Sequence, residues 1–166
     1  MEQLNFINEK EKMKPTKCVF TGHRELGEDF SPTKLKKTIK ALMEDGVEVF
    51  YNGMAMGFDL LAAEQVLALK KKFPNVKLVA CIPYYGQENN FSVHDKRRYV
   101  KVLKKADEQV LLSEEYYRGC LHQRDRYMVD LADVMVAYCV KDKGGAAYTL
   151  AYFRKTKPNC DIFLIP

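Results

Sequence analysis

The sequence contains no tryptophan, and no Cys-x-x-Cys pair occurs among its five cysteines. An odd number of widely spaced cysteines does not form a disulfide framework and lacks the ligand spacing of a structural zinc site. Cys18 and Cys81 lie inside apolar runs, where a free thiol behaves as a small hydrophobic side chain. We therefore expect free thiols and a reducing, cytoplasmic environment.

Long apolar stretches are also missing. No run approaches the roughly 20 residues that a membrane-spanning helix needs, and the first residues lack the apolar segment of a signal peptide. With 9 Gly, 6 Pro and 47% hydrophobic residues in 166, the composition excludes collagen-like, low-complexity and largely disordered chains. We expect one domain over residues 17–166, a polar lead-in at residues 1–16, and no membrane partner.

The excess of positive charge is small, because 27 Lys and Arg residues are set against 22 Asp and Glu residues. This balance permits an anionic partner but does not demand nucleic acid, which usually requires a clustered basic face. The histidines are His23, His94 and His122, and none stands in a His-Glu-x-x-His or Cys/His pattern. The sequence therefore predicts neither a metal site nor a resident cofactor.

Short apolar strands alternate with amphipathic helices along the chain. Strands are predicted at residues 17–21, 47–51, 76–82, 109–112, 134–138 and 161–165, with helices beginning near residues 32, 58, 94, 121 and 146. Continuous apolar runs are typical of parallel strands covered on both faces. We expect an α/β, Rossmann-like, doubly wound and mostly parallel sheet with helices on both faces, whose ligand crevice lies at the carboxyl ends of the strands.

The turns after the first two predicted strands carry polar and glycine residues. Thr21-Gly22-His23-Arg24 offers three side chains that can reach an anion, and an arginine fork suits phosphate oxygens. Asn52 to Asp59 places two glycines before a helix, where backbone N–H groups can face an anion. This second loop matches neither a G-x-G-x-x-G pattern nor a Walker A loop.

Lys143 to Thr149 repeats the same arrangement after a later strand, with Gly144 and Gly145 preceding a helix. Each loop taken alone also has an ordinary explanation as a tight turn. Two such loops at strand ends in one small domain favour a phosphate-bearing ligand.

A further polar segment runs from residue 116 to residue 130. Helical spacing predicts that His122, Arg126 and Asp130 share one face. The residues leave two alternatives open: a solvated, salt-bridged face, or Arg124 or Arg126 pointing into the crevice.

Six blocks of the chain resemble the YpsA/YoqJ family, which belongs to the Rossmann-like SLOG superfamily. They are Thr21 to Arg24, Asn52 to Asp59, Ile82-Pro83-Tyr84 with Gln87-Glu88, Leu112-Ser113-Glu114 with Tyr116-Tyr117, Gln123 to Asp130, and Gly144 to Thr149. The resemblance implies a Rossmann-like fold that binds a nucleotide or nucleotide-derived ligand, in a family whose members mostly lack an established reaction.

Together, the turns and the resemblance give the predicted ligand-binding residues. They are Thr21, Gly22, His23, Arg24, Gly53, Met54, Ala55, Gly57, Asp59, Pro83, Tyr84, Gln87, Arg124, Arg126, Gly144, Gly145 and Thr149.

Two more distant likenesses concern other SLOG proteins. Residues 52–59 are similar to the Ser-Gly-x-Ala-x-Gly-Ile-Asp loop of DprA, a single-stranded DNA-binding relative, and Arg124-Asp125-Arg126 is similar to its Arg-Asn-Arg helix start. Here Asp125 adds a carboxylate that disfavours a nucleic-acid phosphate. SLOG enzymes that cleave cytokinin-type nucleotides carry Pro-Gly-Gly-x-Gly-Thr-x-x-Glu, and residues 143–149 match neither the third glycine nor the catalytic glutamate.

The leading hypothesis is the binding of a nucleotide or nucleotide-derived phosphate ligand in a sensing or regulatory role, with Tyr84 or Tyr116 stacking on a base. One alternative is a hydrolase or transferase acting on nucleotide-derived N-glycosidic bonds through Asp59, Glu64 or Glu88, although no complete catalytic motif is present. The other is DprA-like binding of single-stranded DNA. A homo-oligomer is compatible with each hypothesis.

Overall fold

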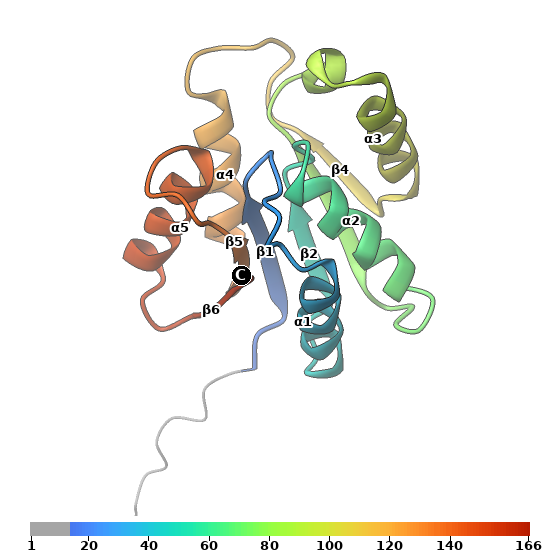
Figure 1. The fold of residues 1–166 in the computed structure, drawn as a ribbon, viewed down its shortest axis with the longest axis vertical. Coiled ribbons are helices and arrows are strands. Elements are labelled where there is room, and N and C mark those ends of the chain that lie inside the picture. The colour runs from blue at the N-terminus through green and yellow to red at the C-terminus, as the bar shows by residue number, and fades with distance from the viewer. Residues whose placement is uncertain (1–13) are drawn as a thin grey trace, which may run out of the picture.

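A single parallel sheet organises the protein, whose computed structural model describes residues 14–166 (Figure 1). The elements are β1 (Lys17–Gly22), α1 (Pro32–Glu44), β2 (Val49–Asn52), α2 (Phe58–Leu69), β3 (Lys77–Ile82), the 3-10 helix η1 (Gln87–Asn90), α3 (Val93–Lys105), β4 (Glu108–Leu111), α4 (Cys120–Leu131), β5 (Val134–Tyr138), α5 (Gly145–Thr156) and β6 (Asp161–Leu164). All neighbouring strands pair in parallel, which confirms the predicted α/β class.

The strand order is β4-β3-β2-β1-β5-β6. The chain runs outward from β1 to β4 and then returns to place β5 on the other side of β1. Cys18 of β1 pairs with Phe50 of β2, and Phe20 pairs with Val136 of β5. This reversal is the switch point of a doubly wound sheet, where connections leave in opposite directions and open a crevice at the carboxyl ends of the strands.

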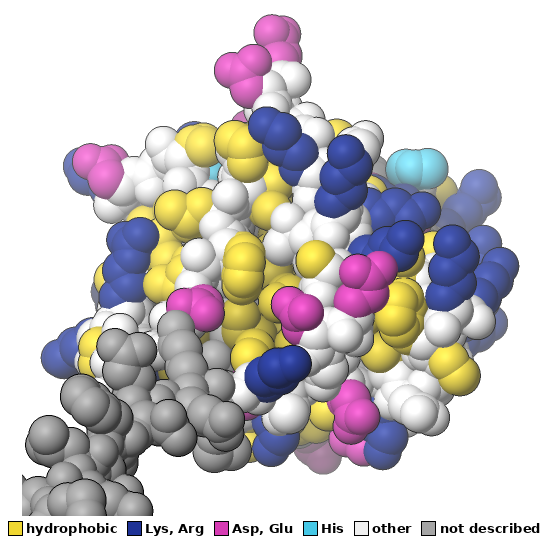
Figure 2. Space-filling view, turned by 90° about the horizontal axis from the view of Figure 1, so that it is seen from below, with side chains coloured by type: hydrophobic (Ala, Val, Ile, Leu, Met, Phe, Trp, Pro, Cys, Tyr) yellow, Lys and Arg dark blue, Asp and Glu magenta, His cyan; other side chains and the backbone are white. Residues whose placement is uncertain are grey.

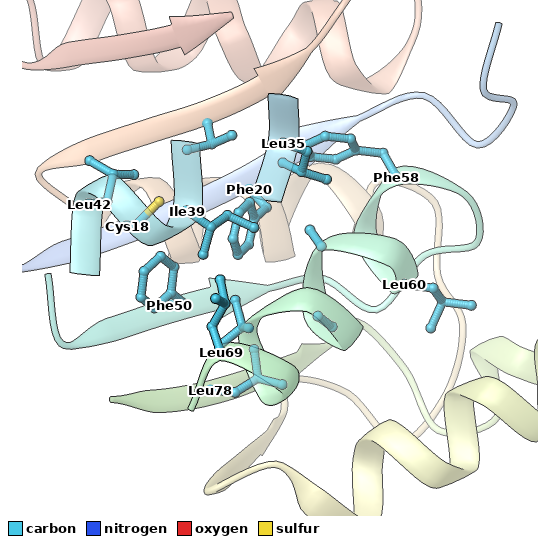
Figure 3. Packing of buried hydrophobic residues seen from close by; sticks show 14 of the residues in the cluster. Cys18, Phe20, Leu35, Ile39, Leu42, Phe50, Phe58, Leu60, Leu69 and Leu78 are labelled. Atoms are coloured by element: carbon cyan, nitrogen blue, oxygen red, sulfur yellow. The ribbon is translucent and has the colours of Figure 1, made fainter. Parts of the chain in front are cut away.

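Helices cover both faces because successive strand residues point to opposite sides of the sheet. Phe20 and Phe50 stack with ring centroids 5.7 Å apart and pack with Leu35 and Ile39 of α1 on one face (Figure 3). Val19, Tyr51 and Met135 face the other side, where they pack with Met128 of α4 and Phe153 of α5. The result is a three-layer molecule with one apolar cluster on each side of the sheet.

The ends of α1 follow from local chemistry. The Ser31 hydroxyl accepts the Lys34 N–H at 3.2 Å, and Pro32 occupies the first turn, where its missing N–H costs nothing. At the other end the Gly46 N–H donates to the Met43 carbonyl at 3.2 Å, and the Val47 N–H donates to the Leu42 carbonyl at 2.9 Å. This is a Schellman cap. Val47, predicted as the start of a strand, therefore belongs to the helix end, and β2 begins at Val49.

The predicted lead-in lies mostly outside the described residues. At its end, the Thr16 and Lys17 N–H groups donate to Asp133 Oδ1 at 3.1 and 2.9 Å. This carboxylate fastens the entry of β1 to the residue that precedes β5.

The cysteines described by the structure are free thiols, as predicted. Cys18, Cys81 and Cys120 are buried, whereas Cys139 and Cys160 are partly exposed. Burial raises the pKa of the Cys81 thiol to about 12, which keeps it protonated and unreactive.

Among residues 14–166, no helix combines the length and apolar character needed to cross a bilayer.

Candidate functional site

A cleft of about 460 Å³ opens at the carboxyl ends of β1 and β5, beside the switch point. Its walls are the β1–α1 turn, the start of α2, the start of α4 and the β5–α5 loop. The lining residues are Thr21, Gly22, His23, Arg24, Glu25, Ala55, Asp59, Leu121, His122, Arg124, Asp125, Lys141, Lys143, Gly144, Gly145 and Ala146. The turns after β1, β2 and β5, far apart in the sequence, therefore meet at one place.

His23 fastens one wall of the cleft to another. Its Nε2 atom accepts the backbone N–H groups of Val140 at 2.9 Å and Lys141 at 3.3 Å. Its ring also packs edge-on against Tyr138, with centroids 5.3 Å apart. Burial and the nearby charge of Lys141 lower the pKa of His23. The imidazole is therefore held neutral, with Nε2 committed to the β5–α5 loop.

The loop between β2 and α2 directs backbone N–H groups inward. The Met54 N–H donates to Asn52 Oδ1 at 2.8 Å, and the Ala55 N–H donates to Asp59 Oδ2 at 3.3 Å. Asn52 Nδ2 in turn donates to the Asp59 carbonyl at 2.8 Å. The first N–H of α2, on Phe58, donates to the His23 carbonyl at 3.1 Å. These N–H groups therefore already have acceptors within the protein.

The glycines of the first two turns allow close packing. A β-carbon on Gly22 would lie 2.3 Å from the Phe58 ring. Gly57 has a φ of +78°, a left-handed conformation that favours glycine. Both glycines therefore allow the β1–α1 turn to pack closely against the start of α2.

The start of α5 is different, because it faces open space. A β-carbon on Gly144 or Gly145 would meet no atom within 4 Å. Gly144 is the N-cap, with no side-chain hydrogen bond to the helix. The first turn of a helix presents N–H groups without intrahelical partners and the positive end of the helix dipole. With the exposed Lys141 and Lys143 beside it, this turn forms the electropositive wall of the cleft.

Asp59 is the buried acid of the cleft, with only 6% of its surface exposed. Its Oδ1 atom has no hydrogen-bond partner among residues 14–166. Burial raises the pKa of Asp59 to about 7, although the positive charge of Arg124 opposes the shift. The carboxyl therefore changes its charge close to neutral pH.

Arg124 is buried and holds the sheet end together. Its guanidinium donates to the carbonyls of Gly53 and Cys81, and its Nε donates to Asp125 Oδ1 at 2.7 Å. Asp125 Oδ2 accepts the Thr149 hydroxyl at 2.9 Å. The chain of contacts thus runs from β2 and β3 through α4 to α5, and Asp125 compensates the buried charge of Arg124.

Several predicted residues lie outside the cleft and contact neighbouring parts of the protein. Gln87 Nε2 donates to the Gly53 carbonyl at 3.1 Å and to the Tyr99 hydroxyl at 3.4 Å. The Tyr84 ring packs edge-on against Tyr116, with centroids 5.3 Å apart, in a separate hollow at the ends of β3 and β4. Arg126 donates to the Tyr148 hydroxyl at 2.7 Å.

Asp130 accepts the Tyr152 hydroxyl at 2.7 Å. The α4 face predicted from His122, Arg126 and Asp130 therefore packs on α5, with each charged residue bonded to a tyrosine.

The cleft brings together nine predicted residues: Thr21, Gly22, His23, Arg24, Ala55, Asp59, Arg124, Gly144 and Gly145. The other predicted residues lie outside its lining: Gly53, Met54, Gly57, Pro83, Tyr84, Gln87, Arg126 and Thr149.

The cleft also contains residues that were not among the predicted ones. His122 lies at its edge and stacks on Tyr148 with centroids 3.8 Å apart and planes 10° apart. Lys141 and Lys143 precede the glycine pair, and these two cations were the available sequence signal. The place of His122 depends on how α4 and α5 pack, which no local pattern reports.

The carboxylates considered for hydrolysis do not gather in the cleft. Asp59 lines it, whereas Glu64 binds the Arg98 guanidinium, which also donates to Asp95 at 3.0 Å. In the described part of the chain, no group of three or more His, Cys, Asp and Glu residues could hold a metal ion.

The sheet order and the cleft at its switch point define a Rossmann-like α/β protein. The sequence model of the YpsA family, described as the YspA SLOG family, matches residues 20–165, and the chain belongs to this family.

Two proteins of Bacillus subtilis (strain 168) are similar to this chain. The UPF0398 protein YpsA is 29% identical over 130 residues, covering 74% of this chain and 72% of YpsA. The SPbeta prophage-derived protein YoqJ is 29% identical over 140 residues, covering 74% of this chain and 82% of YoqJ.

Solved structures of the DNA processing protein DprA share the fold. The Streptococcus pneumoniae protein matches with a TM-score of 0.62 and 19% identity over 91% of this chain. The Helicobacter pylori protein matches with a TM-score of 0.65 and 19% identity over 92% of this chain. This chain spans 50% of the first protein and 66% of the second.

Proposed function

We propose that the protein binds a nucleotide or nucleotide-derived phosphate ligand in the cleft at the carboxyl ends of β1 and β5, in a sensing or regulatory role in the cytoplasm. The observation that carries the proposal is the uncapped start of α5, which opens into the cleft beside Lys141 and Lys143. A helix start with neighbouring cations is a favourable site for a phosphate group.

The phosphate binds between the start of α5 and the β1–α1 turn, and the β2–α2 loop takes no part. The donors of Met54 and Ala55 are already used within the β2–α2 loop, so they add nothing to anion binding. Phosphate recognition therefore falls to α5, the two lysines and Arg24, whose exposed side chain extends from the β1–α1 turn. An arginine fork and lysine ammonium groups both complement phosphate oxygens.

The rest of the ligand meets a different wall. His122, stacked on Tyr148, offers a flat surface at the edge of the cleft, and such surfaces suit a nucleobase. Tyr84 and Tyr116, predicted for this role, lie in their own hollow. We therefore assign base stacking to His122.

The proposal is tested by titration calorimetry with AMP, ADP, ADP-ribose and inorganic phosphate on the wild type and on Gly145→Glu. A glutamate at the first residue of α5 favours the helix dipole, so the variant stays folded while its carboxylate occupies the anion site. We expect a loss of at least about tenfold in affinity, equivalent to about 1.4 kcal/mol.

Thr33→Glu is the matched control, because it adds one negative charge to the first turn of α1, outside the cleft. The proposal fails if the folded wild type binds no compound of the panel, or if Gly145→Glu binds as tightly as Thr33→Glu.

Single-stranded DNA is the second candidate ligand. It is favoured by the likeness in fold to DprA, since the Helicobacter pylori structure describes a single-stranded DNA binding mode of that protein. The ion pair of Asp125 with Arg124 also removes part of the repulsion expected from the sequence.

Fluorescence anisotropy with a labelled oligothymidylate separates the two candidates. DNA binding gives an affinity that falls steeply with salt and resists competition by AMP. A nucleotide site gives AMP binding without tight oligonucleotide binding.

A further inference from the structure

A basic groove lies between α2 and α3, away from the cleft. It has a volume of about 560 Å³ and an apolar floor that includes Leu67 and Val102. Lys71, Lys101 and Lys105 line it. Figure 2 shows Lys and Arg side chains crowded on the right of the face seen there, which is the side of α2 and α3 in Figure 1.

The charge of this groove is not neutralised by the residues that the structure describes. Lys70, at its edge, pairs with Asp107, and Glu64 is bound by Arg98. Within residues 14–166, Lys71, Lys101 and Lys105 form no ion pair. An apolar floor with unpaired lysines at its rim is complementary to a partner that has both carboxylates and large apolar side chains.

The chain carries such a segment in its own β4–α4 loop, at residues 113–118. Glu114 and Glu115 precede Tyr116 and Tyr117, whose side chains are 64% and 42% exposed. Exposed neighbouring aromatic residues are typical of protein interfaces.

The acidic loop is held in a fixed shape. The Ser113 hydroxyl donates to the Glu115 carbonyl at 2.7 Å and accepts the Glu115 N–H at 3.3 Å. The Tyr116 ring packs edge-on against Tyr84 at 5.3 Å. A loop that is ordered before binding loses little conformational entropy on docking.

We propose that residues 113–118 of one copy of the chain dock into the groove between α2 and α3 of a second copy. The glutamates then meet Lys71, Lys101 and Lys105, while a tyrosine ring covers the apolar floor. The loop lies at the carboxyl edge of the sheet, whereas α2 and α3 end toward its amino edge (Figure 1). The lining of the groove comes mainly from the later parts of these two helices. Such a contact joins unlike surfaces, so it builds head-to-tail chains or rings.

The groove favours a protein over a nucleic acid because, within residues 14–166, no aromatic side chain lines it for base stacking. Capture of nucleic acid or of anionic phosphatidylserine vesicles by the groove, in place of self-association, overturns the proposal.

Sedimentation velocity of the nuclease-treated full chain, from low micromolar to several hundred micromolar, is the test. We expect species larger than the monomer that form with rising concentration and dissociate with added salt. Lys101→Glu with Lys105→Glu, and separately Glu114→Lys with Glu115→Lys, should each weaken self-association by at least about tenfold.

Mixing the two double variants lets the reversed loop meet the reversed groove and the unchanged loop meet the unchanged groove, so association returns with copies that alternate. Lys36→Glu with Lys37→Glu on α1 is the control, because it makes the same charge change at exposed positions outside the groove. A monomer at every concentration, association that neither reversal weakens, or a mixture that stays monomeric contradicts the proposal.

Discussion

A β-carbon on Gly57 would lie 2.1 Å from the carbonyl oxygen of Arg24, a separation that atoms in folded proteins do not reach. The turn after β1 therefore packs directly against the N-cap residue of α2. Because Arg24 also lines the cleft, this contact fixes one wall of the candidate site. The shape of the site thus depends on a glycine outside its lining.

Gly57→Ala should destabilise the fold by about 3–5 kcal/mol, the sum of left-handed strain and a backbone clash. Urea unfolding measures this change. Gly46→Ala is the control, because Gly46 has a φ of +105° but no atom within 4 Å of an added β-carbon. It should cost only about 1–2 kcal/mol. If both variants lose the same free energy of unfolding, the backbone at Arg24 moves away from the added β-carbon without a measurable loss of stability.

Arg124→Met should destabilise the protein by about 3–5 kcal/mol, since it leaves Asp125 without its ion-pair partner and removes a donor from the Gly53 and Cys81 carbonyls. Arg124→Lys should not restore stability, because one ammonium cannot reproduce the fork of the guanidinium. Chemical unfolding, with the exposed Arg118→Met as a control, measures both. A wild-type midpoint in Arg124→Lys would contradict the structural role of this fork.

Asp59→Asn should change how stability depends on pH. Burial raises the pKa of Asp59 from 3.8 to about 7. The folded state therefore holds the proton more tightly, and the stability present below about pH 4 is lost as pH rises to 7. At about 1.4 kcal/mol per pKa unit the loss is on the order of 4 kcal/mol, and the variant should avoid it.

Urea unfolding at pH 5 and pH 8 measures this difference. The exposed Asp29→Asn should follow the wild-type profile. Parallel profiles for the wild type and Asp59→Asn would show that the carboxyl titrates in its ordinary range.

His23→Ala should loosen the β5–α5 loop, because the Val140 and Lys141 N–H groups lose their shared acceptor. Hydrogen exchange at these two amides should accelerate by about tenfold or more, while exchange in β1 stays slow. In the wild type, acidification below pH 6.5 should weaken the same contact, since the pKa of His23 is lowered in the fold and the unfolded chain binds the proton first.

His94→Ala provides the comparison, because His94 is exposed on α3. If hydrogen exchange at Val140 and Lys141 is unchanged in His23→Ala, His23 does not hold the β5–α5 loop in place.

The order of helices and strands could be predicted from the sequence because each segment carries its own period and caps. Ser31 and Pro32 mark the start of α1, and Gly46 marks its end. The place of the cleft followed from the same reasoning, since turns at the carboxyl ends of parallel strands must meet on one edge.

The use of each turn could not be predicted in the same way. The glycine loops at residues 52–59 and 143–149 look alike in sequence, but one packs against Arg24 and the other faces open space. The difference depends on which neighbour fills the volume beside each glycine. Arg124 shows the same limit, because a buried arginine and a ligand-binding arginine have identical side chains.

The five thiols differ in burial, so that Cys139 can be labelled selectively once Cys160 is replaced. Cys139 lies at the root of the β5–α5 loop, and its Sγ donates to the Lys141 carbonyl at 3.2 Å. Cys18, Cys81 and Cys120 are shielded in the core, and Cys160 precedes β6, apart from the cleft lining. A maleimide dye that modifies Cys139 in Cys160→Ser would thus place a fluorophore at the root of the loop whose Lys141 and Lys143 line the cleft, without introducing a new cysteine.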